Sequence, residues 1–221
     1  MRKTTIEKLK PLDPRILIHV HDNLSHPFNL TWTHRSHIKE NIEQFRVFMY
    51  AEDDMDIPFS NFINYLDCFP ILWSQKFVPA FIRIEVRDGI YYNTEMRDPL
   101  VVNKENDIIE LGCRKFTRAR FPLPYHAFWI CPQKELKEII HDEGENFFRW
   151  ETNLNQRRER AASLLIWNKI PGNELHSVSS PGLLQLNHSG TQVSPLCYSF
   201  HLPNNYIEDG RIQVEHLLKI V

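Results

Sequence analysis

Two hydrophobic patterns recur along the chain and predict strands and helices in turn. Apolar and polar residues alternate in residues 15–21 and 81–87, as in strands with one buried face. Continuous apolar runs occupy residues 47–50 and 125–130, which is typical of strands covered on both faces. Between residues 38 and 45 the apolar positions recur at i, i+4 and i+7 instead, which predicts one buried helix stripe. We therefore expect strands and helices in one fold.

The segment that leads to residues 47–50 predicts a parallel arrangement of strands. Residues 28–33 favour a strand, Ser36 is placed to cap a helix, and that helix leads into the apolar run. A strand, a helix and a second strand joined by short links form a right-handed βαβ unit in most proteins. We therefore expect an α/β fold with a central mixed, mainly parallel sheet and flanking helices.

The rest of the chain predicts a smaller antiparallel portion and further helices. Asp88 and Gly89 follow the alternating strand at 81–87 and predict a type I′ hairpin turn. On the polar face of that strand, Arg83 and Glu85 are expected to pair across strands or to contact an acceptor. Apolar spacing and the positions of Pro and Gly predict a helix over 60–69 ended by Pro70, a hairpin around 103–107, helices over 133–141 and 157–167, a long loop over 171–195, a strand over 196–200 and an amphipathic end over 212–221.

Composition indicates one domain and argues against several classes of protein. With 42% hydrophobic residues, a chain of 221 residues can bury a core as a single domain over 15–221, after a polar lead-in over 1–14. The net charge of −2 and the dispersed basic residues argue against nucleic acid as a partner. No apolar run reaches membrane-spanning length, so we expect no integral membrane segment. No signal-peptide core is found and the four cysteines lack metal-ligand spacing, so we expect a reduced, cytoplasmic protein.

The strand at 47–50 ends in a cluster of carboxylates. Glu52, Asp53, Asp54 and Asp56 follow it directly, before Pro58. Ligands of open α/β sheets bind at the carboxyl ends of strands, and clustered carboxylates suit a hard cation such as Mg²⁺ or Mn²⁺. An acidic surface turn is the alternative interpretation of the same residues.

Histidine and arginine residues suggest two further roles. His34 and Arg35 stand between a predicted strand and a predicted helix, where a phosphate could bind; the alternative is a solvated arginine at a helix start. His19, His21 and Asp22 form a His-x-His pattern followed by an acid, which could begin the metal site of a hydrolase. No second His-x-His pattern occurs, so half-exposed histidines on a strand are the favoured interpretation.

Two segments, taken with the helix between them, resemble a known family. Residues 30–35 (Leu-Thr-Trp-Thr-His-Arg), the helix, and residues 48–55 (Phe-Met-Tyr-Ala-Glu-Asp-Asp-Met) resemble the nucleotide-binding half of GT-A-type glycosyltransferases. In that family an Asp-x-Asp motif follows a core strand, and here the motif reads Glu-Asp-Asp. Residues 125–130 are similar to the family's acceptor-side strand, and residues 201–206 (His-Leu-Pro-Asn-Asn-Tyr) resemble a late segment that often carries a metal-binding histidine. The resemblance implies a single GT-A-like (Rossmann-like) domain.

The resemblance also implies roles for individual residues. Asp54 matches the family's direct metal ligand, Glu52 the acid that contacts the metal's waters or the ribose, and His201 the late metal ligand. Asp53, His34 and Arg35 complete the expected donor-binding set. Residues 158–163 resemble the helix start where inverting members carry a catalytic carboxylate, so Glu159 is the first candidate for the general base, with Glu145 and Glu151 behind it.

The expected activity is metal-dependent glycosyl transfer, with Mn²⁺ or Mg²⁺ as the cofactor. The donor would be a nucleotide-diphosphate sugar, and the acceptor a hydroxyl group of a glycan or of a small molecule. Two alternatives stay open at this point. One is a metal-dependent hydrolase or phosphoesterase built from His19, His21, Asp22 and the acidic strand, and the other is a non-catalytic protein that binds a sugar nucleotide or a glycan.

Overall fold

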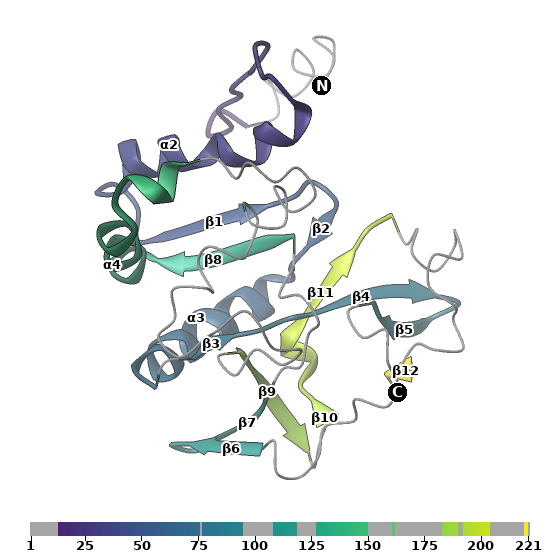
Figure 1. The fold of residues 1–221 in the computed structure, drawn as a ribbon. Helices are drawn as coiled ribbons and strands as arrows, with labels where there is room; N and C mark the ends of the chain where they lie inside the picture. Colours follow the sequence, from purple (N-terminus) through teal and green to yellow (C-terminus); the bar gives the residue numbers. More distant parts are fainter. Residues whose placement is uncertain are drawn as a thin grey trace.

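The structure of this chain is a computed structural model with a mixed α/β fold (Figure 1). Its described part contains three α-helices and strands grouped into three sheets, two of which pair strands both parallel and antiparallel. None of the described helices is long and apolar enough to span a membrane. The residues that the structure describes are 13–75, 77–94, 108–118, 127–149, 161, 183–189, 192–203 and 219–220.

The described N-terminal part of the chain contains no strand where two strands were predicted. Residues 15–21 join no sheet, and residues 28–33 fall in the 3₁₀ helix η1 (Pro27–Trp32), which leads into α2 (His34–Asn41). The hydroxyl groups of Thr31 and Thr33 donate to carbonyls three residues back, at 2.7 and 2.8 Å. Such local hydrogen bonds satisfy the backbone within a turn and compete with strand pairing. The predicted strands at 15–21 and 28–33, and with them the βαβ unit, are therefore wrong.

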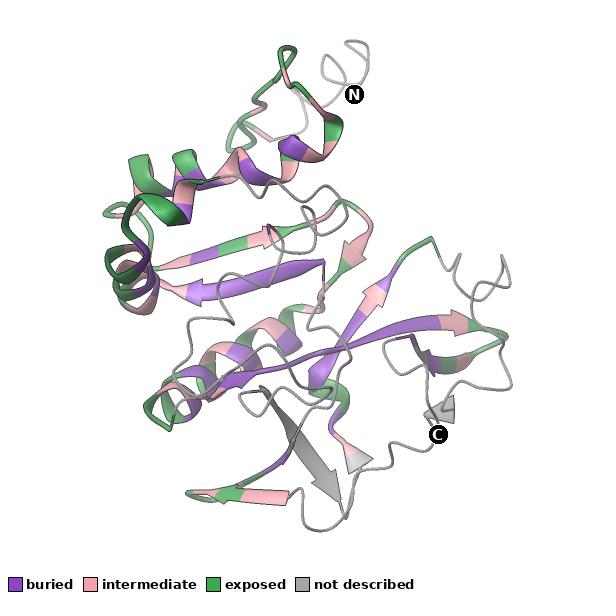
Figure 2. Ribbon diagram, viewed as in Figure 1, coloured by how far each residue is buried: buried purple, intermediate pink, exposed green. Residues whose placement is uncertain are grey.

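The apolar runs at 47–50 and 125–130 contribute to a pair of strands, of which the second is the more deeply buried. β1 (Val47–Ala51) pairs with β8 (Phe128–Pro132), and the pairing is antiparallel. β8 is buried along most of its length (Figure 2). Phe48 and Trp129 belong to the main core, which also takes the buried faces of the helices α3 and α4. Both runs were predicted correctly as strands, but not their relative direction, and the prediction of burial on both faces holds for β8 and not for β1, where only Phe48 is buried and Met49 is 44% exposed.

The helices α3 (Phe59–Ser74) and α4 (Gln133–Glu143) cover this core. α4 confirms the helix predicted from residue 133. α3 passes through Pro70, where the sequence predicted its end. A proline inside a helix costs about 3 kcal/mol. Tyr65, Phe69 and Leu72 are almost fully buried on α3, and burying side chains of this size stabilises by roughly 1.5–3 kcal/mol each, so packing outweighs the cost of the proline.

The predicted hairpin is present in a five-stranded sheet. β4 (Ile82–Arg87) and β5 (Ile90–Asn93) pair around Asp88 and Gly89, whose φ angles of 53° and 75° are those of a type I′ turn. β11 (Tyr198–His201) runs parallel to β4, and β2 (Met55–Asp56) pairs antiparallel with β11. The short β12 (Lys219–Ile220) completes the sheet beside β5. Its order β12-β5-β4-β11-β2 joins the acidic segment to the C-terminal part of the chain.

A third sheet occupies part of the predicted loop. β9 (Leu183–Ser189) and β10 (Gln192–Val193) lie within residues 171–195, so the prediction of a continuous loop there is wrong. β9 pairs with β7 (Arg114–Arg118) and with β3 (Val78–Pro79), and β7 forms a hairpin with β6 (Ile108–Leu111). The hairpin predicted around 103–107 lies outside the described residues.

Strand direction is the largest correction to the predicted fold. Among the described residues only β11 with β4 and β3 with β9 pair in parallel, and the other strand pairs are antiparallel. The expectation of a mainly parallel sheet is therefore wrong for this part of the chain. Continuous apolar runs indicate burial on both faces, and β8, whose residues 128–131 are all buried, meets that condition in an antiparallel pair.

Candidate functional site

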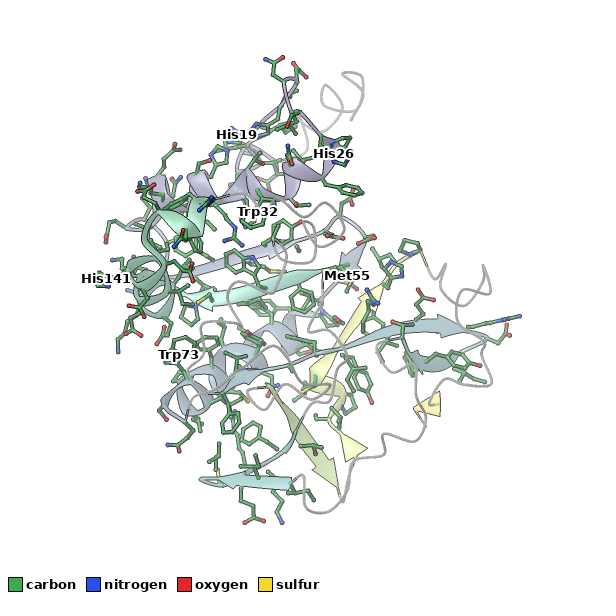
Figure 3. All side chains as sticks on the ribbon, viewed as in Figure 1. His19, His26, Trp32, Met55, Trp73 and His141 are labelled. Carbon is green, nitrogen blue, oxygen red and sulfur yellow. The ribbon has the colours of Figure 1, made fainter. Side chains whose placement is uncertain are left out.

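The acidic turn after β1 lies against the end of β11. β2 follows the turn, and its Met55 lies opposite His201 in the antiparallel register. The backbone N–H of Leu202 donates to the carbonyl of Asp54 at 2.9 Å, which ties the turn to the strand end. Met55, labelled in Figure 3, marks this place in the molecule. The fold thus brings two segments that are distant in the sequence to one position.

His201 lies between two carboxylates. Its Nε2 is 3.4 Å from Asp54 Oδ2, and its Nδ1 is 2.5 Å from Glu85 Oε1 on β4. His201 is 6% exposed and Glu85 is 0% exposed, whereas the side chain of Asp54 keeps 36% of its surface. The site therefore has a buried end at Glu85 and a more open end at Asp54.

One carboxylate oxygen of Asp54 is available to bind a cation. Oδ1 is a buried atom and has no hydrogen-bond partner among the described residues. An ionised oxygen in that position is costly unless a proton or a cation compensates it. No group of three or more His, Cys, Asp or Glu side chains among the described residues could hold a metal ion alone. Asp54 and His201 fit a Mg²⁺ or Mn²⁺ ion of the kind that keeps waters and binds phosphate oxygens of its substrate.

Glu52 and Asp53 belong to the same turn. The backbone N–H of Glu52 donates to the carbonyl of Ala127 at 2.9 Å, which fixes the turn to the beginning of β8. The carbonyl of Glu52 accepts from the backbone N–H of Met55 at 3.3 Å, which closes the turn. Asp53 is exposed and Glu52 is partly buried. The structure therefore places both predicted residues next to Asp54 in one short turn.

Arg35 is buried away from this turn. It is 2% exposed, and its guanidinium lies 4.5 Å from the ring centre of Trp32 and 4.7 Å from that of Phe147. Nη1 donates to the carbonyl of Phe147 at 2.9 Å, and Nη2 to the carbonyl of Ala161 at 3.2 Å. Burial lowers the pKa of Arg35 to about 9. These contacts favour a structural role over the predicted contact with a phosphate.

His34 packs among aromatic rings beside Arg35. Its ring centre lies 4.5 Å from that of Tyr50 and 5.7 Å from that of Trp129. Burial, with a smaller effect of the Arg35 charge, lowers the pKa of His34 to about 3. The ring is therefore neutral at ordinary pH, and a neutral ring gives a phosphate no charge to pair with. The surroundings of His34 do not favour the predicted phosphate contact either.

The histidines of the hydrolase alternative lie elsewhere. The ring centre of His19 is 4.1 Å, and that of His21 is 6.4 Å, from the ring centre of His37 on α2. In Figure 3 His19 lies near the top of the molecule, away from Met55. The described structure therefore does not join the His-x-His pattern to the acidic strand.

The three candidates for the general base are only partly described. Glu159 and Glu151 lie outside the described residues. Glu145 lies in η3 (Gly144–Phe148), where its exposed carboxylate is 4.0 Å from Nζ of Lys39. Ala161, two positions after Glu159, is buried and accepts the hydrogen bond from Arg35.

Glu85 is the site residue whose role the sequence did not predict. It was expected to pair across strands or to contact an acceptor, and it does pair across strands, with His201 of the neighbouring β11, a partner that the sequence did not identify. Arg83, two residues earlier, also pairs across strands, since its Nε donates to Thr94 Oγ1 at 3.1 Å. The sequence feature that could have indicated a buried role for Glu85 is its position between Ile84 and Val86 in an alternating strand.

Comparison with known proteins adds no family. No family model, no curated protein and no solved structure matches this chain.

Proposed function

We propose that this chain is a metal-dependent glycosyltransferase that moves a sugar from a nucleotide-diphosphate sugar to an acceptor hydroxyl group. The observation that carries the proposal is the 3.4 Å contact between His201 Nε2 and Asp54 Oδ2. The resemblance to GT-A-type enzymes implies a late histidine beside the acidic motif. A surface histidine before a loop would have no reason to lie at that carboxylate.

The course of the chain also supports a GT-A-like fold. β1 is a core strand that ends in the Glu-Asp-Asp turn, and β11 returns the C-terminal part of the chain beside that turn. β4 supports β11 from its other side. We propose a GT-A-like arrangement around this turn, in which antiparallel pairs replace part of the parallel sheet.

The residues take the following roles in the proposed reaction. Asp54 and His201 would hold Mn²⁺ or Mg²⁺, Glu52 would contact the waters of the ion or the ribose of the donor, and Asp53 would belong to the donor-binding set. The bound ion supplies positive charge to the departing nucleoside diphosphate. Glu159 accepts the proton of the acceptor hydroxyl group if the reaction inverts the sugar.

Ligand-dependent thermal unfolding tests the proposal. The melting temperature is measured with UDP, GDP and their sugar conjugates, each with and without Mn²⁺. A ligand that binds only the folded state raises the melting temperature, so we expect the largest rise when a nucleotide and Mn²⁺ are both present. Asp54→Ala should abolish that joint effect. Asp56→Ala is the matched control, because Asp56 is an exposed acid of the same segment.

Product analysis then separates the proposal from its alternatives. Release of nucleoside diphosphate from a sugar nucleotide, dependent on Mn²⁺ and on Asp54, supports a glycosyltransferase. Stabilisation without release at any acceptor tried indicates a binding protein. Equal stabilisation of the parent and Asp54→Ala overturns the metal assignment.

A further inference from the structure

Glu85 is a carboxylate at the centre of the five-stranded sheet with no exposed surface. It lies on β4, and its neighbours Ile84 and Val86 belong to the apolar cluster on the other face of the strand. A buried carboxylate loses its hydration and needs compensating contacts in the protein. The contact to His201 Nδ1, at 2.5 Å, is such a contact.

The position of Glu85 determines what the other ring nitrogen can do. A neutral imidazole carries one N–H and one lone pair, and the hydrogen bond at one nitrogen selects which is which. With an ionised Glu85 at Nδ1, the proton lies on Nδ1 and the lone pair on Nε2. Nε2 is the nitrogen that faces Asp54.

The strands hold these groups from two sides. β11 lies between β4 and β2, so Glu85 reaches His201 from one neighbouring strand and Asp54 reaches it from the turn before the other. Histidines that bind metals in proteins commonly donate their second N–H to a carboxylate, which fixes the ring orientation. The order Glu85, His201, Asp54 matches that arrangement.

We propose that Glu85 is a positioning residue that orients His201, so that Nε2 presents its lone pair to a divalent ion bound at Asp54. The inference rests on the proposed function, because it concerns the same ion. Without Glu85 the ring can turn or carry its proton on Nε2, and either change removes the lone pair from the site.

Mn²⁺ affinity of three variants tests the proposal, with free Mn²⁺ measured by electron paramagnetic resonance. Glu85→Ala should weaken Mn²⁺ binding about 10–100-fold, the usual cost of losing an outer partner of a ligand. Glu85→Gln keeps an oxygen acceptor of the same length and should restore most of the affinity. Glu110→Ala is the control, because Glu110 is an exposed glutamate of β6 and should leave the affinity unchanged. If Glu85→Ala does not fold, Glu85→Asp replaces it, since its carboxylate is too short to reach Nδ1.

The tautomer of His201 provides a readout that needs no metal. Nitrogen NMR of the metal-free protein at alkaline pH should show the proton on Nδ1 in the parent and a different tautomer distribution in Glu85→Ala. A purely structural role would lower the melting temperature of the variants and leave the Mn²⁺ affinity of the folded protein unchanged.

The two measurements separate the two proposals. If the parent binds no Mn²⁺, the proposed function fails, and the proposed role of Glu85 toward a bound ion fails with it, whatever the tautomer. If the parent binds Mn²⁺ and Glu85→Ala keeps both the parent affinity and the parent tautomer, the role of Glu85 alone is overturned.

Discussion

Arg35 and His201 are both buried and both carry nitrogen donors, yet their surroundings differ in kind. Arg35 contacts two aromatic rings and the backbone carbonyls of Phe147 and Ala161. His201 contacts the carboxylates of Glu85 and Asp54. These contacts of Arg35 are with rings and carbonyl groups, and they hold separate segments together. Those of His201 are acidic, and one of them reaches a partly exposed turn.

The difference shows that burial alone does not identify a functional site. A buried charge that donates to carbonyls stabilises the fold. A buried imidazole between carboxylates presents groups that bind cations. The following substitutions test this comparison, from the largest expected effect to the smallest.

Arg35→Ala should lower the free energy of unfolding by roughly 3–5 kcal/mol, because a large buried side chain and two hydrogen bonds are lost. Chemical denaturation measures the change. Arg46→Ala, which truncates an exposed arginine, should change stability by less than about 0.5 kcal/mol. A stable Arg35→Ala protein that has lost nucleotide binding would show that Arg35 contacts the donor after all.

His201→Gln should weaken Mn²⁺ binding about 100-fold, at the upper end of the range for outer partners, because a direct ligand is lost. The amide keeps a donor for Glu85, which limits the loss of stability. Isothermal titration with Mn²⁺ measures the affinity, and denaturation measures the stability. Parent-like affinity would remove His201 from the site and leave it with a structural role like that of Arg35.

Glu159→Gln should lower turnover about 100-fold or more with little change in donor affinity, if Glu159 is the general base. This prediction connects the two regions, because Arg35 holds Ala161 only two positions away in the sequence. Steady-state kinetics with a sugar nucleotide and Mn²⁺ measure the effect, and the exposed Glu138→Gln on α4 is the control. Turnover close to that of the parent would reject Glu159 and leave Glu145, Glu151 or a retaining mechanism.

His34→Phe should make folding less sensitive to acid. The folded pKa of His34 is lowered from 6.5 to about 3, so below pH 6.5 the unfolded chain takes up a proton that the folded chain does not. Stability is therefore lost as the pH falls from 6.5 toward 3, by about 2 kcal/mol at about pH 5. Unfolding free energies at neutral and acid pH should differ less in His34→Phe than in the parent. An unchanged difference would show that His34 titrates normally.

The elements that the sequence predicted well have local causes. The turn at Asp88 and Gly89 forms because both residues tolerate positive φ angles. The helix α4 begins at residue 133 because Pro132 favours a helix start. The prediction of a strand over residues 28–33 was wrong because two local tendencies compete there. Their apolar residues suit a strand, but the Thr31 and Thr33 hydroxyl groups bond within a helical turn. The spacing of apolar residues alone does not show whether strand preference or these local hydrogen bonds will prevail.

Only the part of the candidate site formed by Asp54 and His201 was predicted from the sequence. The carboxylates at the end of β1 and the late histidine were recognisable from the sequence, and the fold places Asp54 beside His201 as expected. Glu85 was recognised as a polar residue on a strand, without its partner. Nothing in the order of residues states that β11 runs next to β4, since that pairing joins segments distant along the chain.

The sequence by itself determined which segments are apolar, where several turns occur and which residues could bind a cation, because these depend on the chemistry of neighbouring residues. Only the tertiary structure decided that β1 and β8 are antiparallel, that Arg35 lies between two rings, and that Glu85 reaches His201. Each of these contacts depends on how distant surfaces pack together. Packing is a property of the whole chain, and no local pattern encodes it.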